Sequence, residues 1–336
     1  MLEIGIFSLG YAEAEDLDRH VVNDRVKGLV TLARRAEQAG FDTFALGEYH
    51  HPPFVLSSPA VVLGAIAAVT TTLRLTTSVS LITVNDPVKL AEDFSTVQHL
   101  SDGRLSIMFG RGISTDIYRW WGLAGEDTVA IAAEKNELFR RLWTERKLHW
   151  SGKYRAPLED FTLTPQPLTA ELPEIWQTSI RTKELVEQTA RDADGFFANY
   201  VHFSAAQAAP HVHYFRERFE AHGHGAAGDA PVGSGAAVYV RRNSQDALRE
   251  YRDRGIDLST WPTKYDSLEH AVRESALTVG SPAQVLDKIA TFQEAYGGYR
   301  RQLFSIDGRG GDIDRSIEQI ELIGEHVVPE LRKAYS

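Results

Sequence analysis

Short apolar runs alternate with amphipathic stretches along almost the whole chain. An apolar run over 2–7 predicts a first strand, and the periodic stretch 23–39, which ends before Gly40, predicts a helix. The same alternation predicts further strands over 43–46, 73–79, 105–109, 175–177, 195–198, 232–240 and 303–306. Helices are expected between them over 59–71, 87–100, 132–146, 182–192, 204–221 and 281–295, with a last helix over 312–333.

Eight strand-then-helix units of this kind predict a (β/α)8 TIM barrel with insertions. A doubly wound open sheet is the alternative, but no Gly-x-Gly-x-x-Gly follows the first strand, where a dinucleotide-binding fold needs it. The Trp-, Gly- and Pro-rich segment 148–173 is typical of an insertion with a hairpin, and a second insertion is expected near 241–275. No linker or repeat divides the chain, so we expect a single domain over residues 1–336.

Composition narrows the class of protein. With 336 residues, of which 43% are hydrophobic and 24% charged, the chain has the composition of an ordinary soluble globular protein with a sizeable core. Its net charge of −10 argues against a nucleic-acid partner, and it has no apolar run long enough to cross a membrane. The N-terminus lacks the basic region of a signal peptide, and the absence of cysteine excludes disulfides and thiolate chemistry. We therefore expect a cytoplasmic location.

The stretch Gly110-Arg111-Gly112 closes an apolar strand and carries a charged residue on a backbone freed by glycine. Barrel enzymes place their active sites at the ends of the strands, so this pattern indicates a ligand-binding arginine at the rim of a pocket. The alternative is a tight turn with no ligand.

A second polar group follows the strand predicted at 43–46. Glu48, Tyr49, His50 and His51 stand together there, and they combine a carboxylate with rings suited to proton transfer or cofactor binding. The spacing does not match a helical metal motif, so we expect no metal. The alternative is a loop that is packed by its aromatic rings.

Two further strand ends carry candidate residues. Ser78 and Val79 are small enough for a flat ring to approach the backbone, although they also fit a plain polar strand end. Thr178, Ser179 and Thr182 lead into a helix, whose free N–H groups suit a phosphate, but an ordinary helix cap has the same signature. The pair at 120–121, both tryptophan, covers either the pocket or the core.

Taken together, these segments resemble the bacterial luciferase-like flavin monooxygenases. The resemblance is carried by 40–43, 47–50, 86–93, 101–104 and 110–112, and by the closing segments 278–282 and 327–331. It implies a barrel that uses reduced FMN (FMNH2) and O2, with the FMNH2 delivered by a separate NAD(P)H-dependent flavin reductase. In the family a C4a-peroxy adduct of the flavin attacks an aldehyde, ketone, sulfonate or similar small-molecule substrate. Such barrels usually pair through helices near the second and third units, so we expect a homodimer through the apolar stretch 60–69, unless that helix is buried within its own barrel.

The resemblance also implies roles for single residues. Arg111 matches the arginine that meets the FMN phosphate, and Ser179 and Thr182 match hydroxyls that share that phosphate. Ser78-Val79 matches a non-prolyl cis peptide beneath the flavin ring. Glu48 and His50 match part of a Glu-His-His motif, but Tyr49 stands where many members have the catalytic histidine. Gly110 stands where luciferase has a cysteine near the flavin.

The leading hypothesis is therefore a two-component FMN-dependent monooxygenase. Catalytic roles are assigned to His50, Tyr49 and Glu48, with His51 as a second possible partner of His50. The cofactor-binding residues are predicted to be Ser78, Val79, Gly110, Arg111, Gly112, Thr178, Ser179 and Thr182. The alternatives are an F420-dependent oxidoreductase of the same superfamily and a non-catalytic flavin-binding partner subunit, the latter suggested by Tyr49.

Overall fold

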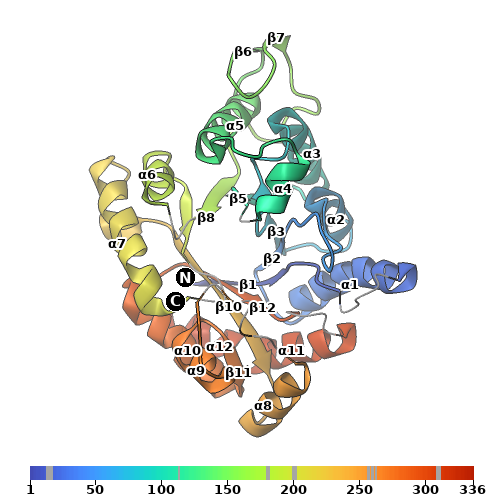
Figure 1. The fold of residues 1–336 in the computed structure, drawn as a ribbon, viewed down its shortest axis with the longest axis vertical. Helices are drawn as coiled ribbons and strands as arrows, with labels where there is room; N and C mark the ends of the chain where they lie inside the picture. The colour runs from blue at the N-terminus through green and yellow to red at the C-terminus, as the bar shows by residue number, and fades with distance from the viewer. Residues whose placement is uncertain are drawn as a thin grey trace.

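Parallel strands closed into a barrel form the centre of the molecule (Figure 1). The computed structural model describes residues 1–12, 18–112, 114–178, 182–198, 203–255, 258, 261, 263–307 and 312–336. The strands run in the order β3-β2-β1-β12-β10-β9-β8-β5-β4, and a parallel bridge between Leu75 and Leu105 brings the two edges together. Their bounds are β1 Glu3–Ser8, β2 Thr43–Leu46, β3 Arg74–Thr77, β4 Ser80–Leu81, β5 Ser106–Gly110, β8 Glu174–Thr178, β9 Gly195–Phe197, β10 Val232–Val240 and β12 Arg301–Ser305. The predicted TIM barrel is confirmed.

Helices surround this barrel, and the two ends of the chain meet beside it (Figure 1). The backbone N–H of Leu2 donates to the carbonyl of Tyr335 at 3.0 Å. None of the described helices has the length and apolarity needed to cross a membrane. Their bounds are α1 Arg19–Gln38, α2 Pro59–Ala67, α3 Pro87–Leu100, α4 Thr115–Trp120, α5 Thr128–Thr144, α6 Lys183–Arg191, α7 Ala205–Ala221, η1 Ala227–Asp229, α8 Ser244–Asp253, α9 Leu268–Glu274, α10 Pro282–Tyr296, α11 Ile313–His326 and α12 Val328–Ala334.

Several element boundaries differ from the prediction for local reasons. The strand expected over 73–79 is divided into β3 and β4 around the cis peptide between Ser78 and Val79. Helix α5 begins before residue 132 because the Asp127 carboxylate accepts hydrogen bonds from the first free N–H groups. The last helix is divided into α11 and α12, and Pro329 occupies the first turn of α12, where a missing N–H costs least.

Other elements were not predicted individually. They include α4, which follows the Gly-Arg-Gly turn, the helices α8 and α9, and the short strand β11 (Thr278–Gly280), which pairs with β10. Between 148 and 173, β6 (Leu148–Trp150) and β7 (Leu158–Phe161) form the expected antiparallel hairpin. The hairpin lies at the top of Figure 1, beyond α5.

The barrel interior holds an apolar layer above an ionic floor. The buried layer comprises Phe7, Ala45, Met108, Trp176, Phe197 and Leu303. Below it, the fully buried Arg301 donates to Glu3 at 2.9 Å and to Glu174 at 2.7 Å, and its guanidinium lies 4.1 Å from the centre of the Trp176 ring. These charged groups belong to the N-terminal ends of β1, β8 and β12. The ionic floor fills this end, which leaves the C-terminal ends of the strands for a site.

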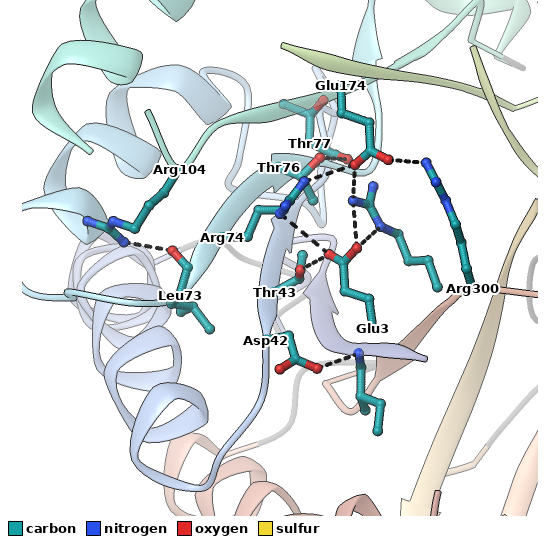
Figure 2. A network of polar contacts seen from close by, with 12 residues as sticks. Glu3, Asp42, Thr43, Leu73, Arg74, Thr76, Thr77, Arg104, Glu174 and Arg300 are labelled. Atoms are coloured by element: carbon teal, nitrogen blue, oxygen red, sulfur yellow. Dashed lines mark hydrogen bonds and ion pairs between the residues drawn. The ribbon is translucent and has the colours of Figure 1, made fainter. Parts of the chain in front are cut away.

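Charge pairing decides the protonation state of this floor. Burial alone would raise the pKa of Glu174, but Arg301, Arg300 and Arg74 together hold that pKa below its ordinary value. Glu174 is therefore ionised at neutral pH, and Arg74 donates to it at 3.0 Å (Figure 2).

Candidate active site

The end of β5 lies directly against the cis peptide. A Cβ atom added to Gly110 would lie 2.4 Å from Cγ2 of Val79, so a larger residue would push β5 away from this segment. Gly112 has a φ of +89°, a conformation that residues with a side chain rarely adopt. The glycines on both sides of Arg111 are thus required by the backbone, one by close approach and the other by its torsion angle.

The peptide bond between Ser78 and Val79 is cis, as the resemblance implied. Thr77, at the end of β3, fixes this segment to β5, because its hydroxyl donates to the carbonyl of Met108 at 2.6 Å and accepts from the Met108 N–H at 2.9 Å. Val79 packs against the apolar layer in the barrel. The Ser78 hydroxyl is buried and has no hydrogen-bond partner among the described residues.

Arg111 is held by its neighbours but retains free hydrogen-bonding capacity. Its Nη1 donates to the Thr128 hydroxyl at 2.7 Å, and its backbone carbonyl accepts from Thr83 at 2.7 Å and from Tyr118 at 2.8 Å. Its Nε is buried without a partner in the described part of the chain. A buried donor left unpaired costs about 1–3 kcal/mol, so an acceptor placed here is favoured.

Glu48 lies at the centre of a hydrogen-bond network. One carboxylate oxygen accepts from the Ser80 hydroxyl and the Leu81 N–H, both at 2.9 Å. The other accepts from Asn85 Nδ2 at 2.7 Å and lies 2.9 Å from His50 Nε2. Because the buried carboxylate already has these partners, it is arranged to orient His50 and to connect it to β4.

The three rings that follow Glu48 face different surroundings. His50 contacts Glu48 on one side and the ring of Trp121 on the other, with 4.7 Å between ring centres. Tyr49 instead stacks on Phe54, with 3.9 Å between ring centres, and burial raises the pKa of its hydroxyl. His51 lies edge-on to Phe54, with Nδ1 2.8 Å from the Pro52 carbonyl. Of these rings, His50 is the one joined to the carboxylate network.

Sequence reasoning missed the support that α5 supplies. Lys135 Nζ donates to the carbonyls of Thr83 at 2.6 Å and Asn85 at 2.8 Å, and burial lowers its pKa. Thr128, at the start of the same helix, holds Arg111. A lysine and a threonine on an amphipathic helix give no local signal of such contacts, because the partners lie about 50 and 17 residues away.

Of the remaining predicted residues, Thr178 lies at the same end of the barrel as Gly110. Gln177 pairs in register with Phe109, so Thr178 and Gly110 follow as neighbours on adjacent strands. Thr182 is the N-cap residue of α6. Ser179 lies outside the described residues. Within the described ranges, no group of three His, Asp or Glu side chains is arranged to hold a metal ion. The cofactor and catalytic roles of all these residues stay predictions.

Comparison with known proteins places this geometry in a family. The model of the luciferase-like monooxygenase family matches residues 2–298. The chain belongs to the luciferase-like monooxygenase family. Its structural neighbours agree with that assignment at the level of the fold.

Three solved structures illustrate the likeness. Monooxygenase RslO1 from Streptomyces bottropensis is 21% identical, with 98% of this chain and 99% of that one covered and a TM-score of 0.87. The oxygenating constituent of 3,6-diketocamphane monooxygenase from Pseudomonas putida, in complex with FMN, is 17% identical, with 98% of each chain covered and a TM-score of 0.81. The F420-dependent tetrahydromethanopterin reductase of Methanopyrus kandleri is also 17% identical, with 98% and 99% covered and a TM-score of 0.76.

In this luciferase-like protein, the residues at the rim fit a phosphate-bearing flavin. The Arg111 guanidinium offers a charged donor, and the buried Ser78 hydroxyl has no partner among the described residues. Gly110 has no side chain, so residue 110 leaves the backbone beside the cis peptide uncovered.

Proposed function

We propose that this protein is an FMN-dependent two-component monooxygenase that uses reduced FMN and O2 to oxygenate a small organic substrate. The observation that carries the proposal is Arg111, directly after β5, a partly buried guanidinium whose Nε has no partner among the described residues. Membership of the luciferase-like family and the FMN bound by the diketocamphane enzyme support the same cofactor. When bound, reduced FMN supplies the electrons that activate O2.

The chain's own residues then have distinct tasks. Arg111 binds the FMN phosphate together with Thr178, Ser179 and Thr182. Ser78, Val79, Gly110 and Gly112 form the surface on which the flavin ring lies. His50, oriented by Glu48, holds and transfers the proton that the reaction requires.

An F420-dependent oxidoreductase is the second candidate, because the Methanopyrus reductase shares the fold. That enzyme class transfers a hydride and needs no O2. A non-catalytic flavin-binding subunit is less well supported, because the Glu48–His50 pair supplies a group suited to proton transfer even though Tyr49 replaces the usual histidine.

Substituting Arg111 tests the cofactor site. A guanidinium–phosphate hydrogen bond contributes roughly 1.5–3 kcal/mol, so Arg111→Ala is expected to weaken FMN binding by about tenfold or more while the fold survives. The measurement is an anaerobic titration of wild type and variant with reduced FMN, with reduced F420 in a parallel series. Unchanged FMN affinity in the folded variant would remove Arg111 from the site, and binding of F420 alone would favour the second candidate.

The proposal includes a separate electron donor. The sequence carries no dinucleotide-binding fingerprint after any predicted strand, so FMNH2 has to come from an NAD(P)H-dependent flavin reductase. We place this exchange in the cytoplasm, where NAD(P)H is available.

We also propose a homodimer. Val61, on α2, is 73% exposed. Val69, just after α2, and Leu100, the last residue of α3, are exposed as well. Large apolar side chains left in water favour association with a matching surface. Light scattering at micromolar concentration is expected to give twice the mass of one chain, and a monomer mass would contradict this expectation.

A further inference from the structure

Helix α4 is attached to the barrel rim by one face. The Tyr118 hydroxyl lies 2.8 Å from the carbonyls of both Arg111 and Gly112, so α4 is tied to the Gly-Arg-Gly turn. Ile117 is buried in an apolar cluster with Leu81 and Val84. These contacts fix the helix without help from the tryptophans that end it.

The two tryptophans are left largely in water. The Trp120 side chain is 51% exposed and that of Trp121 is 42% exposed. Both are large aromatic side chains, and two of them exposed at consecutive positions give an apolar surface of the kind that binds ligands. Their positions differ in one respect: the Trp121 ring contacts the ring of His50, whereas the Trp120 ring contacts no aromatic ring in the described part of the chain.

We propose that Trp121 is the substrate-binding wall of this site and that it selects a neutral substrate with a flat apolar ring. This inference rests on the proposed function, because it places the substrate at His50. A ring lying on the indole keeps its reacting group within reach of His50, whose centre is 4.7 Å from that of Trp121. An anionic group at the same position would lose water against the negative face of the indole, so a neutral ring is favoured over an anionic one.

A binding experiment tests this assignment without turnover. The probe is 2-naphthol, a flat neutral ring, titrated calorimetrically into the protein with and without FMN. Trp121→Ala is expected to weaken its binding by about tenfold or more, and Trp121→Phe to retain most of the affinity. Trp120→Ala is the matched control, since it removes the same kind of side chain from the neighbouring position, and it is expected to stay within about twofold of wild type.

The outcomes distinguish the role proposed for Trp121 from the proposed FMN-dependent function. Equal affinities for wild type and Trp121→Ala, an equal loss in Trp120→Ala, or no binding of 2-naphthol to the wild type would each overturn the proposal. Naphthalene-2-sulfonate is expected to bind more weakly than 2-naphthol, and tighter binding would overturn the neutral class. FMN affinity, measured in the same samples, is expected to be unchanged in Trp121→Ala. If FMN does not bind at all, the proposed function fails. The affinities of wild type and Trp121→Ala for 2-naphthol then still show whether Trp121 binds the ring.

Discussion

Replacing His50 with alanine is expected to lower turnover by at least about a hundredfold and to leave FMN affinity near the wild-type value. A positioned acid or base contributes about 10²–10⁴-fold to a reaction, and His50 is the ring that Glu48 orients. Its loss removes the proton-transferring group but leaves Arg111 and the cis peptide in place. The measurement is the steady-state rate with FMNH2 supplied by a flavin reductase, combined with an FMN titration of the same variant.

Tyr49→Phe is the control for this prediction. The Tyr49 ring stacks on Phe54, and burial raises the pKa of its hydroxyl, which disfavours the ionised form that a base requires. We expect its rate to remain within about threefold of wild type, well below the effect of a catalytic acid or base. A large loss in Tyr49→Phe with a small one in His50→Ala would transfer the catalytic role to the tyrosine.

Arg301→Met is expected to destabilise the fold by about 3–5 kcal/mol, because it leaves two partly buried carboxylates without their main partner. Arg301 is fully buried and donates to both Glu3 and Glu174. Urea unfolding of the two proteins measures the difference. A loss below about 1 kcal/mol would show that the ionic floor contributes little.

Arg300→Met is the matched control, because Arg300 also pairs with Glu174 but its side chain is 50% exposed. We expect this variant to lose about 1 kcal/mol or less.

The pH dependence of stability provides a second check on the ionic floor. Since the folded protein lowers the pKa of Glu174, this stabilisation is present above about pH 4.3 and is lost as the pH falls through the folded pKa. Because Arg301 is one cause of the lowered pKa, the free energy of unfolding of Arg301→Met is expected to fall less than that of wild type as the pH is lowered below about 4.3.

Much of the fold followed from local patterns. The alternation of apolar runs and amphipathic stretches predicted the barrel, because each strand and each helix buries its own apolar face. The hairpin after 148 followed from its turn-forming residues. The division of the last helix into α11 and α12 was missed, although Pro329 marks it, because the apolar period continues past that point.

The candidate site was predicted less completely. Residues at strand ends, such as Arg111 and His50, could be found because a barrel brings strand ends together. The cis peptide came from the resemblance and not from the residues themselves. The contacts of Lys135 and Trp121 could not be predicted, since each depends on how a helix lies on the rim and not on a local motif.

The proposed chemistry is tested most directly by the origin of the oxygen in the product. The purified chain is supplied with FMN, NADH and a separate flavin reductase under ¹⁸O2, and aldehydes, ketones and sulfonates are screened as substrates by mass spectrometry. We expect product that carries ¹⁸O, formed only when chain, reductase and O2 are all present, and no oxidation of NADH by the chain and FMN alone. Turnover that proceeds without O2, product without ¹⁸O, or turnover with reduced F420 but not with reduced FMN would contradict the account.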